Sequence, residues 1–185
     1  MSRTFLSPRL WEIDVFLSTS ECSQLVSRAE DSALEQAPII AVGGNRIDVV
    51  ARNNDRLVFE DSALLDIMWH RLIADGAWTQ SGRAAAGLNE RLRLYRYRPG
   101  QHFDWHADMP YQRQDGQRSL LTLLVYLNDD YEGGETRFES RTVNPRAGSA
   151  LVFEHGLVHK GNSVQSGLKF ALRTDVMFLP RGNAA

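Results

Sequence analysis

Residues 91–98 read RLRLYRYR, and this stretch decides the fold class. Apolar and charged side chains alternate along it, which predicts a β-strand with two different faces. Pro99 and Gly100 follow as a turn signal. Further strand-like stretches come at short intervals, separated by Gly, Pro and Asn turns: 119–128 (SLLTLLVYLN), 136–143 (TRFESRTV), 148–155 (GSALVFEH) and 169–179 (KFALRTDVMFL). The succession predicts a mainly β (α+β) protein built on a β-sandwich or jelly roll.

The chain before this stretch has a different pattern. Residues 11–17 (WEIDVFL) predict a short strand, and Ser18 with Glu21 forms a capping-box pattern at the start of a helix that we expect to end at Pro38. Asp61 is a candidate cap for a second helix ending at Gly76.

The segments between and after these helices carry weaker signals. We expect residues 39–59 to be irregular or weakly extended, with a turn at Gly43 and Gly44, and residues 79–90 (TQSGRAAAGLNE) to form a loop or short helical turn. We therefore expect a single domain over 1–185, in which 1–90 supply helical support and the first strands and 91–180 form the core.

The composition narrows the function classes. The chain has 185 residues, a net charge of −2 and one cysteine, Cys22, which excludes an internal disulfide and a cluster of thiolate metal ligands. The charge balance gives no electrostatic case for binding nucleic acid. The longest apolar run, 119–128, is about half of what a membrane-spanning helix needs. We expect a soluble, cytoplasmic protein without a membrane partner or a secretory signal.

Residues 100–109 (GQHFDWHADM) contain two histidine–x–aspartate pairs, His102 with Asp104 and His106 with Asp108. On an extended strand all four side chains would point to the same side. A set of histidines and carboxylates without cysteine suits iron, manganese or zinc. One such pair is a weak signal, because a metal site of this kind needs a third ligand from elsewhere in the chain.

Two later histidines are candidates for that third ligand. His155 and His159 lie near the end of the strand predicted at 148–155. Their spacing would pair them on a helix, but Gly156 and the strand context argue against one, and EHGLVH lacks the zinc-protease pattern His-Glu-x-x-His. Further along, Lys169 and Arg173 share one face of the last predicted strand. They form either a solvated face or a socket for a dianionic small molecule beside the metal.

Taken together, these segments resemble the iron(II)- and 2-oxoglutarate-dependent dioxygenases of the prolyl 4-hydroxylase-like branch. The matching stretches are LYRYRPGQHFDWHAD, RSLLTLLVYLNDDYEGGETRF, VNPRAGSALVFEH and LVHKGNSVQSGLKFALRTDVMF, which together span about 92–178. The segment FLSTSECSQLVSRAE also looks like the helical support of that branch. The resemblance implies a double-stranded β-helix, which is a jelly roll, with the metal between its two sheets.

The resemblance also implies roles for individual residues. In the family pattern the ligand pair begins six residues after a glycine that Gly100 matches, so His106 and Asp108 match two iron ligands, and His159 matches the third. Lys169 matches the basic residue that pairs with the far carboxylate of 2-oxoglutarate. The positions that line the co-substrate pocket are matched by Tyr97 and Thr122.

The remaining candidates have other expected roles. We expect His102 and Asp104 beside the metal ligands or facing the substrate, and a structural role for His155. Arg173 is not part of the common family pattern. It could hold either the 1-carboxylate of 2-oxoglutarate or a carboxylate of the substrate, and we hypothesise the second. Residues 109–118 are consistent with either a lid or a plain surface loop, and the glycines of 133–135 (GGE) predict a tight turn.

The implied activity is hydroxylation of an unactivated C–H bond with Fe(II), 2-oxoglutarate as co-substrate and ascorbate as an auxiliary reductant. Its substrate would be a prolyl residue in a peptide or protein, or a free amino acid or other small metabolite. Two alternatives remain open. One is a nucleic-acid demethylase, which the basic stripe of Arg91, Arg93, Arg96 and Arg98 favours and the net charge does not. The other is a non-catalytic jelly-roll binding protein.

Overall fold

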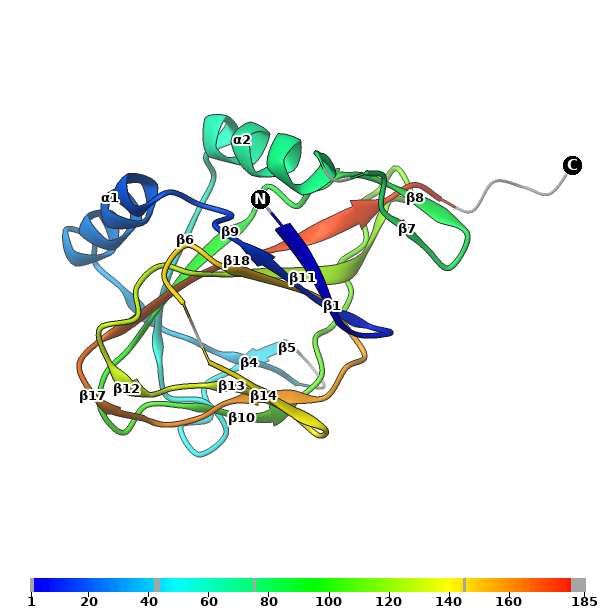
Figure 1. Cartoon of the computed structure of the whole chain (residues 1–185). Coiled ribbons are helices and arrows are strands. Elements are labelled where there is room, and N and C mark those ends of the chain that lie inside the picture. The colour runs from blue at the N-terminus through cyan, green and yellow to red at the C-terminus, as the bar shows by residue number, and fades with distance from the viewer. Residues whose placement is uncertain (1, 42–43, 75, 145, 181–185) are drawn as a thin grey trace, which may run out of the picture.

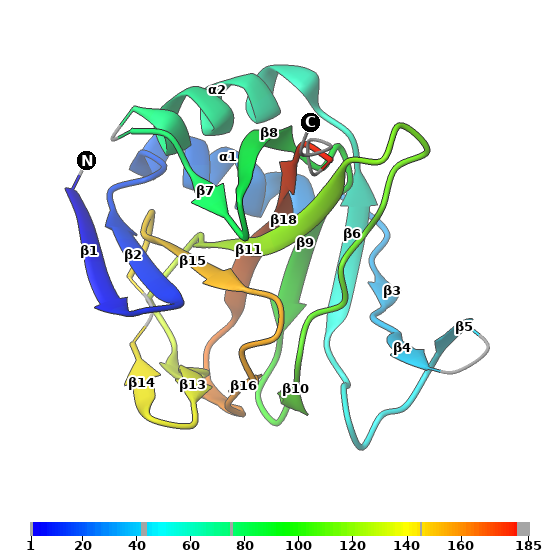
Figure 2. The same ribbon diagram turned by 90° about the vertical axis from the view of Figure 1, so that its right-hand side faces the viewer.

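The computed structural model describes residues 2–41, 44–74, 76–144 and 146–180. Two helices cover one side of a large antiparallel sheet, and a smaller sheet lies on the other side (Figure 1). The view turned by 90° shows the helices packed across the strands of the large sheet (Figure 2). The predicted jelly roll with supporting N-terminal helices is confirmed.

The large sheet forms the rigid wall of the molecule. Its longest partners, β11 and β18, pair from Arg118 opposite Phe178 to Tyr126 opposite Ala171. Both strands are buried on both faces over most of their length, as the nearly continuous apolar sequence of β11 indicates. The order across the sheet is β1 (Ser2–Ser7), β2 (Leu10–Asp14), β15 (Ala150–Glu154), β11 (Arg118–Tyr126), β18 (Lys169–Phe178), β9 (Leu92–Tyr97), β6 (Asp55–Phe59) and β3 (Glu35–Gln36).

The smaller sheet contains the strands β10 (Phe103–His106), β16 (His159–Gly161), β13 (Thr136–Phe138) and β14 (Arg141–Val143), in that order. Its register pairs His106 with His159. Two short ribbons complete the fold, β12 (Glu132–Gly133) with β17 (Val164–Ser166), and β4 (Ile39–Ala41) with β5 (Gly44–Arg46). The register of β10 against β16 therefore brings together two imidazoles that are distant in the sequence.

Both helices begin directly after the capping residues predicted from the sequence. Helix α1 (Thr19–Glu30) has the full capping box: the Glu21 amide donates to Ser18 Oγ, and the Ser18 amide donates to the Glu21 carboxylate at 2.8 Å. Helix α2 (Ser62–Ile73) begins at Asp61, whose Oδ1 accepts from the Leu64 amide. The helices bury an apolar stripe against the large sheet, and the contributing residues are Cys22, Leu25, Ala29, Met68 and Leu72.

Two expectations about the N-terminal half are wrong. Helix α1 ends at Glu30 and not at Pro38, because the Ser32 hydroxyl donates to the Arg28 carbonyl and closes the last turn. Residues 79–88 form a hairpin of β7 (Thr79–Gln80) and β8 (Arg83–Leu88), not a loop or helical turn. Ser81 and Gly82 both have positive φ, as a tight hairpin turn requires, and the C-terminal residues of β18 supply a partner for β8.

Gly43, half of the turn expected at 43–44, lies outside the described residues. Within the described ranges no helix has both the length and the apolar character needed to cross a lipid bilayer.

Candidate metal centre

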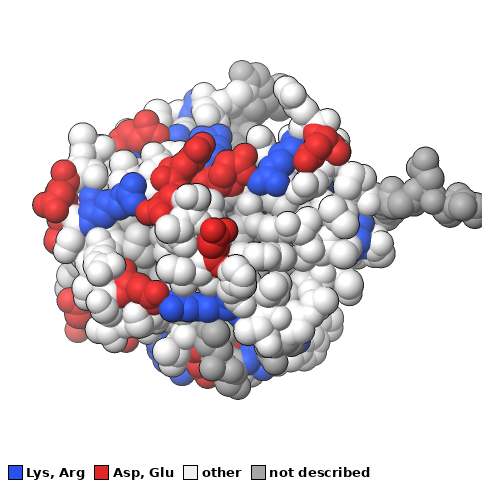
Figure 3. Space-filling model, turned by 90° about the horizontal axis from the view of Figure 1, so that it is seen from above, with Lys and Arg blue, Asp and Glu red and all other residues white. Residues whose placement is uncertain are grey.

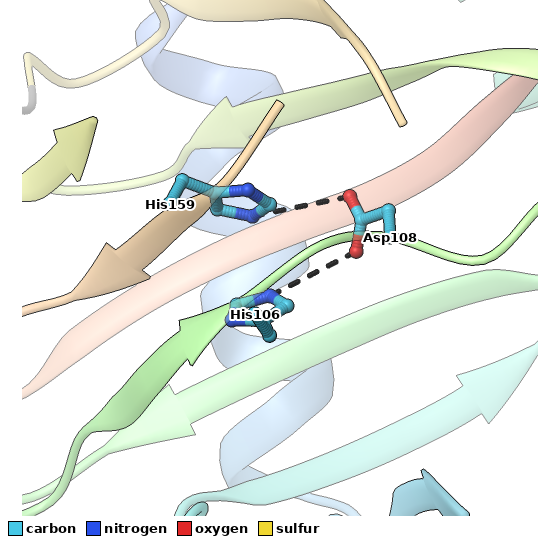
Figure 4. A group of neighbouring side chains, drawn as sticks. All are labelled: His106, Asp108 and His159. Atoms are coloured by element: carbon cyan, nitrogen blue, oxygen red, sulfur yellow. Dashed lines mark ion pairs between the residues drawn. The ribbon is translucent and has the colours of Figure 1, made fainter. Parts of the chain in front are cut away.

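Three side chains converge between the two sheets. His106 ends strand β10, Asp108 lies two residues beyond it, and His159 begins strand β16 (Figure 4). Their ligand atoms all lie within 4.8 Å of one another. His106 Nε2 is 3.8 Å from Asp108 Oδ1, and His159 Nε2 is 3.9 Å from Asp108 Oδ2. Atoms that share one ion at bond lengths of about 2.0–2.2 Å must lie within about 4.4 Å of each other, and both nitrogen–oxygen pairs meet that limit.

The backbone sets the tautomer of both imidazoles. His106 Nδ1 is 2.7 Å from the Asp104 carbonyl, and His159 Nδ1 is 2.8 Å from the Leu157 carbonyl. A carbonyl oxygen only accepts, so each Nδ1 must carry the proton. Each Nε2 therefore presents a lone pair to the space beside Asp108, the arrangement found in histidine metal ligands.

Only the second histidine–x–aspartate pair contributes to this group of three side chains, because the strand is not regular. The β10–β16 register shifts between Phe103 and His106, and the Phe103 ring stacks on His106 at 3.5 Å. The segment is therefore not a regular extended strand, and the condition under which all four side chains would point to one side is not met. His102 Nε2 lies 3.0 Å from the Val50 carbonyl, away from the triad, and Asp104 is exposed on the rim of an outer groove.

The protonation states suit a divalent cation. Burial lowers the pKa of His106 to about 3, with the neighbouring His159 adding to the effect, and burial also lowers the pKa of His159. Burial alone would raise the pKa of Asp108, but the Arg173 guanidinium and the two imidazoles hold it far below its usual range. A metal ion requires deprotonated ligands, and two neutral imidazole nitrogens and one carboxylate meet this requirement. Such a donor set suits iron, manganese or zinc and leaves further coordination positions open.

A directed chain of hydrogen bonds orients the carboxylate. Thr122 Oγ donates to Asp108 Oδ2, and His155 Nδ1–H donates to Thr122 at 3.0 Å. Ser119 Oγ donates to His155 Nε2 at 2.9 Å and accepts from the Tyr111 amide at 2.8 Å. Because each hydroxyl has one proton, the chain runs in one direction from the 109–117 segment to Asp108. The other carboxylate oxygen, Oδ1, meets Arg173 Nη1 at 2.8 Å.

Lys169 lies in the same inner cavity as the triad. Its ammonium is buried and donates to the Gly134 carbonyl at 2.6 Å, with the rings of Tyr97 and Tyr126 about 5 Å away. No carboxylate of the described ranges lies within ion-pair distance of it, and burial lowers its pKa to about 8, with Glu135 opposing part of the shift. A buried cation without a counter-charge is costly, so the cavity is built for an anionic ligand.

Two further predicted residues line this cavity. Tyr97 and Thr122 share its wall with the triad and Lys169. Burial raises the pKa of Tyr97 to about 12, so its hydroxyl stays protonated and can donate. The Gly133–Gly134 turn has positive φ at both residues, as expected, and it also shapes the cavity. A Cβ at Gly134 would lie 3.2 Å from the stem of Lys169 and 3.1 Å from Tyr131 and Val164.

Several residues of the site have no recognisable signal in the sequence. Arg52 follows an irregular segment, yet its buried guanidinium lies between the rings of Tyr95 and Phe103, at 4.6 and 4.2 Å from their centroids. His155, expected to be structural, forms the middle of the hydrogen-bond chain that reaches Asp108. These contacts join parts of the chain that are distant in sequence, so local patterns do not report them.

Comparison with known proteins shows which proteins this chain is similar to. Residues 92–174 match the 2OG-Fe(II) oxygenase superfamily. Prolyl 4-hydroxylase 1 of Arabidopsis thaliana is 28% identical over 167 residues, which is 86% of this chain and 54% of that protein. Probable prolyl 4-hydroxylase 3 of the same plant is 29% identical over 144 residues, 74% of this chain and 47% of that protein. The chain thus spans about half the length of these relatives.

Solved structures show the same fold. The viral collagen prolyl hydroxylase of Paramecium bursaria Chlorella virus-1, in its 2OG complex, has a TM-score of 0.65 at 23% identity, covering 94% of this chain and 98% of that one. A Pseudomonas putida prolyl-4-hydroxylase has a TM-score of 0.68 at 18% identity, with 91% of each chain covered. The matched segment, the relatives and the geometry of the triad together support a 2OG-Fe(II) oxygenase of the prolyl 4-hydroxylase-like branch.

Proposed function

We propose that the protein is an Fe(II)- and 2-oxoglutarate-dependent dioxygenase that hydroxylates an unactivated C–H bond. The substrate we favour is a prolyl residue in a peptide or protein, or a free amino acid or related small molecule. One observation carries the proposal: two neutral imidazoles and one carboxylate share a buried cavity with a lysine that has no counter-charge among the described residues. The demethylase and binding-protein alternatives have no comparable support.

Each residue has a defined part in this proposal. His106, Asp108 and His159 would hold Fe(II), and Lys169 would pair with the far carboxylate of 2-oxoglutarate, with Tyr97 as a neighbouring hydroxyl donor. Iron, 2-oxoglutarate and dioxygen together supply the oxidising chemistry, and the protein supplies binding and orientation. Thr122 acts on the centre through its hydrogen bond to Asp108 Oδ2, which leaves the carboxylate one preferred orientation.

The walls of the cavity suit an oxidation that must be protected from water. Phe103, Leu124 and Phe153 line it between the two sheets, together with the rings of Tyr95 and Tyr97. The Phe153 ring also meets His159 edge-on at 4.7 Å and so restricts its rotation. Apolar walls around a few polar groups are typical of small-molecule sites, and they keep bulk water from the reacting centre.

The test is a reconstitution with Fe(II), 2-oxoglutarate and ascorbate. We expect succinate release that depends on added Fe(II), and a gain of one oxygen atom, seen by mass spectrometry, in a proline-containing peptide or a free amino acid. His106→Ala should show neither. Equal succinate release from wild type and from this variant would contradict the proposal.

A further inference from the structure

An outer groove continues from the inner cavity to the protein surface. The two spaces share Arg52, Tyr95, Phe103, His106, Asp108 and Arg173 as lining residues, so the groove reaches the candidate iron ligands directly. Its volume is about 290 Å³, close to the lower end of ligand pockets in proteins. The half-exposed side chains of Trp105 and Met109 contribute apolar surface near the outside.

The groove is strongly basic for a chain of net charge −2. Five arginines line it: Arg52, Arg56, Arg91, Arg93 and Arg173. Only two acidic residues of the described chain do, Asp104 and the candidate ligand Asp108. By contrast, the side of the molecule seen from above shows basic and acidic side chains interspersed (Figure 3). Positive charge in a cleft concentrates anions there, and a divalent ion on the triad would add to it.

The outer arginines differ in how far they are neutralised. Arg56 pairs with the exposed carboxylate of Glu35, and Arg93 pairs with the buried carboxylate of Asp175. Arg91 is exposed at the rim, and no ion pair connects it to the rest of the described chain. The rim therefore keeps a positive charge that an approaching anion would meet first.

The two innermost arginines each keep one nitrogen without a partner. Arg52 donates from Nε to Asn54 Oδ1 at 2.8 Å and from Nη1 to the Pro38 carbonyl, but its buried Nη2 has no partner among the described residues. Arg173 is held by Asp108 and Asp175, and its buried Nε likewise has no partner there. A buried donor without a partner is unfavourable, and more so when it is charged. Both guanidinium groups are thus held in place with donor capacity left over.

The pKa of the Tyr95 phenol shows the combined effect of the nearby positive charges. Burial would raise the pKa of Tyr95, yet Arg52, Arg173 and Arg93 lower it below its ordinary value. Its ring lies under the Arg52 guanidinium and lines both the inner cavity and the groove. An anionic oxygen brought to this point would be favoured by the same three guanidinium groups.

We propose that Arg52 and Arg173, beside Tyr95, form an anion subsite that binds a carboxylate of the substrate close to the C–H bond to be hydroxylated. Arg56, Arg91 and Arg93 would draw such substrates along the groove. This inference rests on the proposed function and narrows its substrate class. An internal prolyl residue in a neutral peptide has no charge to place there. The carboxylate comes either from the hydroxylated residue itself or from an acidic side chain next to it.

The test compares ligands that differ in one charge. The wild-type protein, loaded with Fe(II) and saturating 2-oxoglutarate under argon, is titrated by calorimetry with three compounds: acetyl-Gly-Pro amide, acetyl-Gly-Pro with a free carboxylate, and acetyl-Asp-Pro amide. Without dioxygen no turnover occurs, so binding alone is measured. We expect at least one carboxylate compound to bind about 10-fold or more tightly than the neutral amide, as charge-assisted hydrogen bonds predict. The compound that binds more tightly than the neutral amide shows whether the carboxylate belongs to the hydroxylated residue or to a neighbouring acidic side chain.

Three variants assign the effect to the groove. Arg52→Gln should remove most of the preference for the carboxylate compounds, and Arg91→Gln should remove a smaller part that also fades with added salt. Arg141→Gln, which removes a charge at a distant surface hollow, should change nothing. Thermal melts show whether Arg52→Gln still folds. If it does not, the wild-type ligand comparison and Arg91→Gln still test the proposal, because neither changes a buried residue.

The outcomes separate this inference from the proposed function. Equal affinity for all three compounds would overturn the anion subsite, and so would a preference that Arg52→Gln and Arg91→Gln leave intact or that Arg141→Gln removes. If oxidation of the neutral amide proceeds while the carboxylate compounds have no advantage, the enzyme proposal stands and the subsite fails. If a carboxylate compound binds tightly but no succinate forms in air, the subsite stands and the enzyme proposal fails.

Discussion

Lys169 illustrates how burial changes the chemistry of a single residue. Its ammonium is almost fully removed from water and meets one carbonyl oxygen, so its pKa falls to about 8. The protonated form is the one that attracts a carboxylate. A lysine and an arginine at this position would therefore differ in their response to pH, because an arginine stays charged throughout.

The first prediction follows from that difference. For the wild type, kcat/KM for 2-oxoglutarate should fall as pH rises through about 8, by about 10-fold per pH unit, because this ratio reports the ionisation of the free enzyme. Lys169→Arg should lose this decline even if its absolute activity is lower. The measurement is initial succinate release between pH 7 and 9. Superimposable pH profiles for the two proteins would assign the decline to another group and refute the role of Lys169.

The same depressed pKa has a consequence for stability, with a definite sign. Between about pH 8 and the ordinary lysine value of 10.5, the unfolded chain binds the proton and the folded chain does not. The free energy of unfolding of the ligand-free protein should therefore rise with pH across this window. Lys169→Met should lack that rise in denaturant titrations at pH 8 and pH 10.

At the scale of elements, the directed hydrogen-bond chain connects β11, the end of β15 and the 109–117 segment to Asp108. His155 is its middle member, and both of its ring nitrogens have partners. Burial lowers the pKa of His155, which keeps the ring neutral, so one nitrogen donates while the other accepts. Residues 109–118, expected to form a lid or a surface loop, are thus coupled to a candidate metal ligand through the Tyr111 amide.

The second prediction concerns this chain of hydrogen bonds. His155→Ala should reduce the free energy of unfolding by about 2–4 kcal/mol, because the buried hydroxyls of Thr122 and Ser119 lose a partner. It should also weaken Fe(II) binding by about 10-fold, as loss of a group that orients a metal ligand does. His155→Gln should recover part of both effects. Denaturant titration and metal titration measure them, and His70→Ala, which changes a histidine on α2 far from the triad, is the control.

A second interaction at this scale connects the two helices. Glu21 completes the capping box of α1 and also pairs with Arg71 on α2 at 2.8 and 2.9 Å. The hydrogen bonds from Arg71 do most to lower the pKa of Glu21 to about 2, although its limited burial acts in the opposite direction. One carboxylate therefore satisfies a helix end and also joins two helices, through a partner 50 positions away in the sequence.

The third prediction tests this shared carboxylate. Because the pKa of Glu21 is lower in the folded state than its ordinary value of 4.5, its contribution to stability is present above pH 4.5 and is lost as pH falls towards 2. Glu21→Gln should lower the melting temperature at neutral pH and flatten its dependence on pH across that window. Ser18→Ala should cost about 1 kcal/mol through the loss of the cap alone, with the pH dependence retained. Thermal melts between pH 2 and 7 distinguish the two variants.

At the scale of the whole molecule, the candidate metal centre is a cross-link. His106 and His159 come from the smaller sheet, while the residues that orient Asp108, namely Thr122 and Arg173, come from the large one. An ion bound to the triad would therefore connect the two sheets, and it would bind the folded state only. Ligands of that kind raise stability in proportion to the logarithm of their concentration.

The fourth prediction follows from this arrangement. At an Fe(II) concentration about 100 times the Kd, under argon, the free energy of unfolding should rise by about 2.7 kcal/mol. For a chain of this size, that corresponds to an increase in Tm of about 5–10 °C. A chelator should reverse the increase, and His106→Ala should not show it. An equal response of the variant would place the bound metal elsewhere.

The order of residues was enough to predict the class of fold and the positions of the helix caps. Alternating and continuously apolar stretches predicted the strands β9, β11, β15 and β18, because burial on one or both faces leaves a direct trace in residue order. The helix starts at Ser18 and Asp61 were also predictable, because a capping side chain and the amide it accepts from are only three residues apart. The resemblance to a family, and not the spacing of histidines, singled out the second of the two histidine–x–aspartate pairs.

Which side chains meet in the site became visible only in the folded chain. The bulge in β10 separates His106 from His102, the register of β10 against β16 brings His159 to it, and the partner strand β18 turns 83–88 into a strand. Arg52 and His155 reach the centre in the same way, through partners that lie far from them in the sequence. The physical reason is that strand register and side-chain packing depend on contacts between distant parts of the chain, which local periodicity does not encode.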